Sequence, residues 1–270
     1  MDRALLVGIN AYPGAPLNGC VNDILDMADF LVKKRGFASA SIRLLTDARA
    51  TKTAIVERLR WLTNGLKAGD RAFFHYSGHG AQVASRAGSG EVDNKDEVIC
   101  PVDFDWTDAR MIRDKDFHQM FSKVPAGVEF VWVSDSCHSG DLERGLPPRG
   151  APRKVPRTMY PPADLSWRLR TARDADVKAL SFVHSVAGLN VALISGCKSN
   201  QTSADASFGG RANGALTYFL LQSLQAPKAL SKRLDAIVAA TRGALRKSNY
   251  SQEPQLEGST AIMARPFLAP

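Results

Sequence analysis

The sequence predicts an α/β fold in which a mainly parallel central sheet carries helices on both faces. Short apolar runs alternate along the chain with longer segments whose apolar residues recur at the 3.6-residue period of a helix. This alternation is typical of βαβ units, whose parallel strands are covered on both sides. The runs expected to form strands lie at residues 4–9, 42–45, 72–76, 128–134 and 191–195.

The segments between these runs supply the helices. Apolar residues on one face predict a helix that begins near Val21 and ends at Gly36. Further helices are expected at about 51–66, 114–123, 213–224 and 231–247, and a last short strand near 260–264. In sheets of this type ligands bind beyond the carboxyl ends of the strands, so the functional side chains are expected there.

Length and composition indicate one large domain over residues 1–270, because 270 residues with 44% apolar content can bury one substantial core. No apolar run is long enough to cross a membrane, and the first apolar stretch is too short for a signal peptide. We therefore expect a soluble cytoplasmic protein. The four cysteines, Cys20, Cys100, Cys137 and Cys197, lack paired spacing and suit a reducing compartment. All but Cys137 are expected to be small buried hydrophobes.

Positive charge is concentrated in residues 144–173. This segment contains eight Lys or Arg residues against one acid, and it holds six of the fourteen prolines. Such a composition predicts a long exposed excursion, for which a solvated loop is the simplest interpretation. Its only aromatic residues are Tyr160 and Trp167, so any binding to nucleic acid should be nonspecific and salt-sensitive.

Two short segments that follow strands carry the residue types of nucleophilic catalysis. The first, HYSGHG, contains His79, and the second, DSCHSG, contains Cys137. A thiol attacks a carbonyl as thiolate, and an imidazole at a neighbouring strand end could serve as its base. The other two histidines of these segments, His75 and His138, are expected to point elsewhere, His75 to the strand face opposite Tyr76.

Other catalytic chemistries do not fit the spacing. A cysteine phosphatase requires Arg six positions after Cys137, but that position is Glu143. A serine nucleophile elbow requires Gly two residues before Ser77, where the chain has His75. A zinc site would need a third ligand beside His75 and His79 at a standard spacing.

Together with the stretches LNGCVND, PVDF and ISGCKSNQTSAD, which begin at residues 17, 101 and 194, these segments resemble the caspase-like cysteine peptidases. The resemblance is closest to the metacaspases and to their bacterial relatives, the orthocaspases. Caspase sequences have a histidine about 50 residues before the cysteine, and here 58 separate His79 from Cys137. The resemblance implies a caspase-like three-layer sandwich. It divides the domain into a large-subunit-like region, about 1–143, the basic loop 144–173 and a small-subunit-like region, 174–270.

The resemblance also implies the roles of the site residues. Cys137 would be the nucleophile and His79 the general acid and base, with an oxyanion hole formed by the amides of Gly80 and Cys137. Asp23, Ser77 and Asp135 would line the primary specificity pocket, and Asp205 would add to it. Buried carboxylates require a compensating cation, which predicts cleavage after Arg or Lys. The alternative for Asp23 is a capping or dipole role at the start of its helix.

The resemblance also bears on calcium. Many metacaspases bind an activating calcium ion through four aspartates, and Asp96 and Asp114 match two of them. Where two further ligands are usual, this chain has Lys115 and Arg144, although Asp116, Asp141 or Glu143 could partly substitute. We expect weak calcium dependence or none, and no other cofactor.

The sequence thus predicts a cysteine endopeptidase that cuts protein or peptide substrates after Arg or Lys. The basic loop offers such bonds in an exposed segment, so self-cleavage is expected between Arg144 and Arg173. Two alternatives remain: a catalytically silent caspase-like scaffold, and a module that binds an anionic partner through the basic loop. A monomer without specific nucleic-acid or membrane partners is expected.

Overall fold

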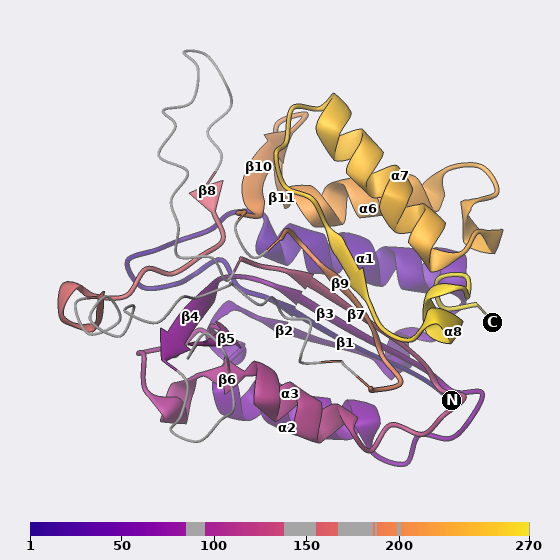
Figure 1. Ribbon diagram of the computed structural model, residues 1–270, viewed down its shortest axis with the longest axis horizontal. Helices are drawn as coiled ribbons and strands as arrows, with labels where there is room; N and C mark the ends of the chain where they lie inside the picture. The colour runs from indigo at the N-terminus through magenta and orange to yellow at the C-terminus, as the bar shows by residue number, and fades with distance from the viewer. Residues whose placement is uncertain (85–94, 138–154, 167–185, 187, 199–200, 270) are drawn as a thin grey trace.

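The computed structural model describes residues 1–84, 95–137, 155–166, 186, 188–198 and 201–269. At its centre lies a six-stranded sheet with the order β12-β9-β7-β3-β1-β2 (Figure 1). Its strands are β1 Asp2–Gly8, β2 Ile42–Thr46, β3 Arg71–Ser77, β7 Glu129–Asp135, β9 Ala192–Ser195 and β12 Gln255–Glu257. All neighbours are parallel except β12 and β9. The predicted α/β fold with a mainly parallel sheet is confirmed.

Two small antiparallel sheets lie beyond the carboxyl ends of the central strands. One contains β4 Gly80–Ala84, β5 Lys95–Ile99 and β6 Ile112–Arg113. The other contains β8 Val155–Pro156, β10 Ala204–Phe208 and β11 Arg211–Gly214. In Figure 1 both sheets lie at the same end of the central sheet, opposite the chain termini.

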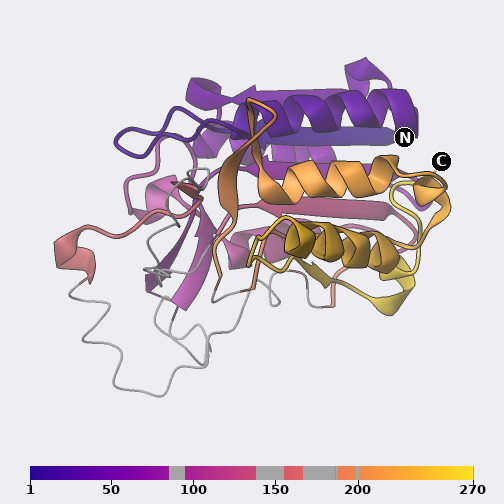
Figure 2. The same cartoon turned by 90° about the horizontal axis from the view of Figure 1, so that it is seen from above.

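Helices cover both faces of the central sheet (Figures 1 and 2). One face carries α1 Cys20–Arg35, α6 Ala215–Gln225, α7 Leu234–Lys247 and the short α8 Thr260–Met263. The other face carries α2 Lys52–Thr63 and α3 Asp114–Phe121. Single 3₁₀ turns lie between these elements: η1 Ser39–Ser41, η2 Asp47–Arg49, η3 Asp108–Arg110 and η4 Ala229–Ser231. Residues 163–166 are also helical. Within the described residues, no helix has both the length and the apolar composition needed to cross a membrane.

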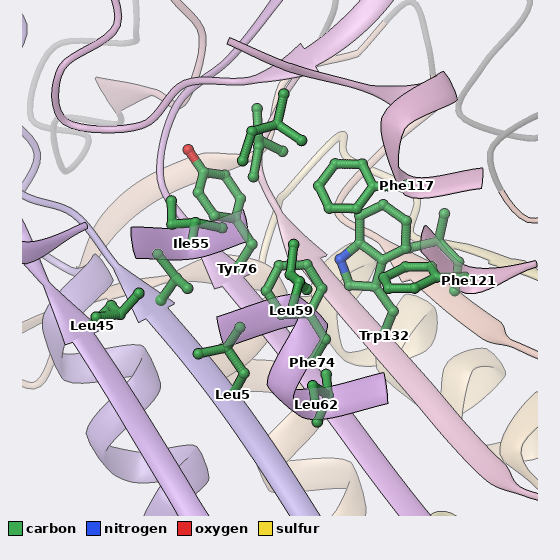
Figure 3. Close-up of a cluster of buried hydrophobic side chains, with 14 of the residues drawn as sticks. Leu5, Leu45, Ile55, Leu59, Leu62, Phe74, Tyr76, Phe117, Phe121 and Trp132 are labelled. Atoms are coloured by element: carbon green, nitrogen blue, oxygen red, sulfur yellow. The ribbon is translucent and has the colours of Figure 1, made fainter. Parts of the chain in front are cut away.

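The two faces of the sheet have separate apolar cores because successive strand residues point to opposite sides. Figure 3 shows part of the core beneath α2 and α3, where aromatic rings and aliphatic side chains pack together. Trp132 of β7 packs against Phe117 of α3 with ring centroids 4.5 Å apart, and against Phe74 of β3 at 5.6 Å. These fully buried rings hold the two strands that lead to the candidate site.

The predicted helix boundaries agree closely with the structure. Gly36 ends α1 in the left-handed conformation, with φ of 72°, which glycine adopts without strain. At the start of α2 the hydroxyl of Thr51 accepts a hydrogen bond from the amide of Ala54, 3.3 Å away. Helix α6 begins at Ala215, because the two preceding residues belong to β11.

The strand predicted near 260–264 is wrong. These residues form α8, whose first turn is capped by Ser259: its hydroxyl accepts a hydrogen bond from the amide of Ile262. The last strand is β12, which pairs with β9 through Leu256 and Ile194. An apolar run of three or four residues suits a buried helical turn as well as a strand, and here the local serine cap decided.

Candidate active site

Three central strands deliver the candidate residues to one end of the sheet. In the strand order, β1 lies between β2 and β3, so the chain connections diverge at β1 and β3. Such a switch point leaves a crevice beyond the carboxyl ends of the strands. His79 follows β3 by two residues, Cys137 follows β7 by two, and Asp23 lies in the first turn of α1, after β1.

The backbone of His79 is fixed by two buried tyrosines. The amide of His79 donates to Tyr12 Oη at 3.1 Å, and its carbonyl accepts from Tyr76 Oη at 2.6 Å. The two hydroxyls are 3.0 Å apart. A side chain on Gly78 would collide with both, since its Cβ would lie 2.5 Å from Tyr12 Oη and 2.7 Å from Tyr76 Oη. The turn after β3 therefore requires glycine.

The His79 ring is oriented by a backbone carbonyl. Its Nε2 lies 2.8 Å from the carbonyl oxygen of Ala15, which can only accept, so Nε2 carries the proton. Among the described residues Nδ1 has no hydrogen-bond partner. Burial lowers the pKa of His79 to about 4, although the carbonyl of Ala15 acts in the opposite direction. The ring is thus neutral, with an unprotonated Nδ1.

The Cys137 side chain is buried and contacts the stretch before β10. Its Sγ donates to the carbonyl of Ser203 at 3.3 Å and accepts from the Ser203 amide. Within the described residues no hydrogen bond joins this thiol to Nδ1 of His79. A transfer of the thiol proton to His79 therefore requires Sγ to leave Ser203.

The three aspartates predicted for the specificity pocket lie together, and they surround Arg157 from the basic segment. Arg157 Nη2 lies 2.8 Å from Asp23 Oδ2 and 2.9 Å from Asp205 Oδ1. Arg157 Nη1 lies 3.2 Å from Asp135 Oδ1 and donates to Ser77 Oγ at 2.8 Å. The guanidinium is completely buried. We call the Asp23, Ser77, Asp135 and Asp205 side chains the acidic pocket.

This arrangement corrects one expectation. The solvated-loop interpretation of the basic segment fails for Val155–Met159, because Val155 and Pro156 form β8 and Arg157 is fully buried. The carboxylates compensate the charge of the buried guanidinium, which water would hydrate if the side chain were exposed. The remaining basic residues of the segment, Arg144, Arg149, Arg153, Lys154, Arg168, Arg170 and Arg173, lie outside the described residues, as does His138.

Electrostatics in the acidic pocket depend on the guanidinium. Burial alone would lower the pKa of Arg157, but the charges of Asp135, Asp23 and Asp205 outweigh it, and the pKa is raised. Burial raises the pKa of Asp23 to about 6, even though Arg157 lowers it. An empty pocket would therefore hold its negative charges at a high cost, and a cationic side chain relieves that cost.

Neighbouring groups hold each aspartate in place. Asp135 Oδ2 accepts from the amide of Thr217 at 2.9 Å and from its hydroxyl at 2.7 Å, and Asp135 Oδ1 accepts from Ser203 Oγ at 2.7 Å. Asp23 Oδ1 accepts from Asn213 Nδ2 at 3.0 Å and from the Gly214 amide at 2.9 Å. Asp23 is also the acidic residue in the first turn of α1. It therefore lies both at the helix start and in the acidic pocket.

The backbone of Arg157 is held by hydrogen bonds at its carbonyl oxygen and at its amide. Its carbonyl oxygen accepts from the amide of Gly80 at 3.0 Å and from that of Cys137 at 3.1 Å. Its amide donates to the carbonyl of Ser203 at 3.1 Å, and the amide of Met159 donates to that of Gly80 at 2.8 Å. The two amides predicted for an oxyanion hole thus converge on one carbonyl oxygen, that of Arg157.

His75 lies on the opposite face of β3 from Tyr76, as expected. It is fully buried, and its Nε2 lies 3.2 Å from Thr217 Oγ1. Burial lowers its pKa to about 3, so the ring is neutral. His75 therefore lies beside Thr217, which in turn binds Asp135.

Asp96 and Asp114, which match a calcium site, already have protein partners. Asp96 is buried, with Oδ2 at 2.6 Å from Arg113 Nη1 and Oδ1 at 2.8 Å from Lys115 Nζ. Asp114 Oδ1 accepts from the amide of Lys115, and Asp116 accepts from the amide of Arg113. No group of three or more metal-ligating side chains occurs within the described residues, which exclude Asp141, Glu143 and Arg144. A calcium ion at these residues would have to compete with Arg113 and Lys115 for Asp96.

Sequence reasoning missed several residues of this site. Tyr12 and Ala15 lie between β1 and α1, and apart from this position nothing in the sequence marked them as functional. Asn213, Gly214 and Thr217 belong to the stretch RANGALT, which spans β11 and the start of α6. Its polar residues and glycine, directly before an apolar helix, could have marked a functional turn. Arg157 was one of eight basic residues and had no feature that singled it out.

Comparison with known proteins agrees with this geometry. The family profile described as "Metacaspase, peptidase C14 domain" matches residues 2–143. A metacaspase-1 of Schizosaccharomyces pombe is 32% identical over 95% of this chain and 67% of its own length. A metacaspase-1 of Ajellomyces capsulatus is 34% identical over 95% of this chain and 79% of its own length.

The fold agrees as well. A crystal structure of a protein from Geobacter sulfurreducens superposes with a TM-score of 0.69 at 27% identity, covering 99% of this chain and 98% of that protein. The caspase-like architecture expected from the sequence is confirmed. The profile match and the identity to the fungal relatives add sequence evidence to the shared fold. The chain therefore belongs to the metacaspase family of the C14 peptidases.

Proposed function

We propose that the protein is a cysteine endopeptidase that cleaves after Arg or Lys, with Cys137 as nucleophile and His79 as general acid and base. The observation that carries this proposal is Arg157, whose guanidinium lies in the acidic pocket while its carbonyl oxygen accepts from the amides of Gly80 and Cys137. A substrate residue before the scissile bond requires both contacts at once, because one gives specificity and the other stabilises the oxyanion.

Each step of the proposed reaction has a candidate group among these residues. After Sγ leaves Ser203, the neutral His79 takes its proton at Nδ1, and the thiolate attacks the carbonyl carbon of the bound residue. The negative charge on the oxygen is met by the Gly80 and Cys137 amides; loss of one such donor typically costs about 3 kcal/mol. His79 then protonates the leaving amine, and water releases the acyl group from Cys137. The Ala15 carbonyl keeps the ring oriented throughout.

Hydrolysis of matched fluorogenic peptides ending in Arg, Lys or Asp tests this function. We expect turnover of the Arg and Lys peptides by the wild type, none of the Asp peptide, and none of any peptide by Cys137→Ala. Because Asp29 is an exposed carboxylate on α1, Asp29→Asn serves as a folded control with wild-type turnover. Silence of the wild type toward every peptide, before and after prolonged incubation, would favour the catalytically silent scaffold.

We further propose that the chain cuts itself in the basic segment, and that the Arg157–Thr158 bond is the one cut. The residues around this bond make backbone contacts on both sides, to Ser203 and to Gly80, and β8 pairs with β10 through Val155 and Asp205. An added strand of this kind is a common mode of peptide binding. Until it is cut, the segment occupies the pocket that an external substrate needs.

The self-cleavage prediction concerns Arg157→Ala. The wild type should yield a fragment whose first residue is Thr158, at a rate independent of protein concentration because the bond already lies in its own site. Arg157→Ala should yield no such fragment, while Arg153→Ala, four residues away, should yield it as the wild type does. N-terminal sequencing of the products provides the measurement. A first cut elsewhere in residues 144–173 would contradict the choice of bond without contradicting the peptidase.

We propose that calcium is not required. Arg113 and Lys115 already neutralise the buried Asp96, so a divalent ion would have to displace two cations before it could bind. We expect the same rate of Arg-peptide hydrolysis, within about twofold, in millimolar calcium and in excess chelator. A requirement for millimolar calcium in this assay would overturn the proposal.

We also propose that residues 1–270 act as one peptidase domain and as a monomer on protein substrates. At one edge of the central sheet, strand β12 is only three residues long and offers few backbone groups to a second copy.

A further inference from the structure

Cys137 and Cys197 follow neighbouring strands of the central sheet. Strands β7 and β9 are parallel, and Ser134 pairs with Ser195. The two segments stay adjacent past the strand ends: a Cβ built on Gly196 would lie 3.3 Å from the carbonyl oxygen of Ser136. Adjacent strands are about 4.8 Å apart, which lies within the Cα separation of about 4.4–6.8 Å that a disulfide spans.

The two thiols converge on one short stretch of chain. Cys137 Sγ donates to the carbonyl of Ser203, and Cys197 Sγ donates to that of Gln201 at 3.1 Å. The pKa of Cys197 is raised, first by the interaction of its side chain with the Cys137 thiol and then by burial. Cys197 is half-buried, which corrects the expectation that it is a small buried hydrophobe.

We propose that Cys137 and Cys197 form an oxidation site, at which a hydroperoxide converts the two thiols into a disulfide. The Cys137 sulfur attacks the peroxide, so an S–O bond forms, the O–O bond breaks and an alcohol or water leaves with the thiol proton. The Cys197 sulfur then displaces the hydroxyl from Cys137 as a second water, which takes the Cys197 proton. The two sulfurs lose two electrons, and the peroxide gains them.

The disulfide has a consequence for catalysis. A Cys137 sulfur bonded to Cys197 cannot attack a carbonyl, so oxidation stops turnover, and a dithiol reductant restores it. Cys197 thereby protects the nucleophile, because a sulfenic acid without a nearby thiol is oxidised further to species that reductants do not reverse. This loss of turnover rests on the proposed role of Cys137, whereas the disulfide itself does not.

The test is to treat the full-length protein with hydrogen peroxide, alkylate the remaining thiols and map the peptides by mass. We expect a linked pair of peptides that contain Cys137 and Cys197, absent in Cys197→Ser and present in Cys100→Ala, whose altered thiol is buried elsewhere in the core. Failure to find the linked pair in the wild type would overturn the proposal.

Activity provides a second readout of the same site. Arg-peptide turnover of the wild type should fall on peroxide treatment and recover with dithiothreitol, whereas that of Cys197→Ser should fall and recover far less. Equal recovery in both would contradict the protective role of Cys197. A linked pair of peptides in a protein that hydrolyses no peptide would instead leave the oxidation site standing and overturn the proposed function.

Discussion

Asp135→Asn is expected to lower kcat/KM for an Arg peptide by about 30- to 1,000-fold, which corresponds to about 2–4 kcal/mol. Both carboxylate oxygens of Asp135 face hydrogen-bond donors. Oδ2 accepts from Thr217, and Oδ1 accepts from Ser203 and lies beside the guanidinium of Arg157. An asparagine side chain must therefore turn its NH₂ group toward a donor on one side or the other. The pocket also loses one of the charges that compensate the guanidinium, so binding of the cationic side chain weakens.

Steady-state hydrolysis of Arg and Lys peptides measures this effect, with Asp29→Asn as the matched amide substitution on the surface. The Lys peptide should lose turnover too, because its ammonium needs the same negative charge. A change of less than about threefold in kcat/KM for both peptides would show that Asp135 does not contribute to the pocket as proposed.

Gly214→Ala is expected to reduce Arg-peptide turnover by about 100-fold or more, because displacement of a bound group by about 1 Å can cost that much. The backbone of Gly214, with φ of −71°, suits any residue, so the effect comes from the added methyl group alone. That Cβ would lie 2.3 Å from Arg157 Nη1 and 2.3 Å from Asp135 Oδ2. Glycine here leaves the space that the flat guanidinium occupies.

The matched control is Gly243→Ala in α7, where an added Cβ meets no atom within 4 Å. This variant should hydrolyse Arg peptides as the wild type does and should gain about 0.5–1 kcal/mol in stability, as expected for alanine in a helix. Comparison of thermal unfolding separates a damaged fold from a blocked pocket. Wild-type Arg turnover by Gly214→Ala would show that arginine does not enter the pocket as Arg157 does.

The α/β class could be predicted from the sequence because period and apolar content are local properties. Strands such as β3 and β7 are continuous apolar runs, and α1 has a one-faced pattern that stops at a glycine. The short elements could not be predicted in this way. The turn α8 and the strand β12 contain few residues each, and a single cap or a pairing partner decides between helix and strand.

The candidate residues near the strand ends could also be placed from the sequence, because parallel strands bring their carboxyl ends to one edge. The chemistry of His79 and Cys137, and their position directly after strands, indicate a catalytic pair. Asp23, Asp135 and Asp205 were chosen by family resemblance, and they lie together in the structure around one guanidinium. The supports of these groups, such as Ala15 and Thr217, make backbone or hydroxyl contacts that leave no residue-type signal.

The sequence by itself determined the fold class, the reactive residue types and the order in which the strands present them. Only the tertiary structure decided which cation the acidic pocket holds. In the part of the basic segment that the structure describes, Val155 and Pro156 pair with β10, and this pairing brings the side chain of Arg157 to the three carboxylates. The physical reason is that burial of like charges must be compensated by a cation from elsewhere in the chain, and such long-range compensation depends on distances that no local pattern encodes.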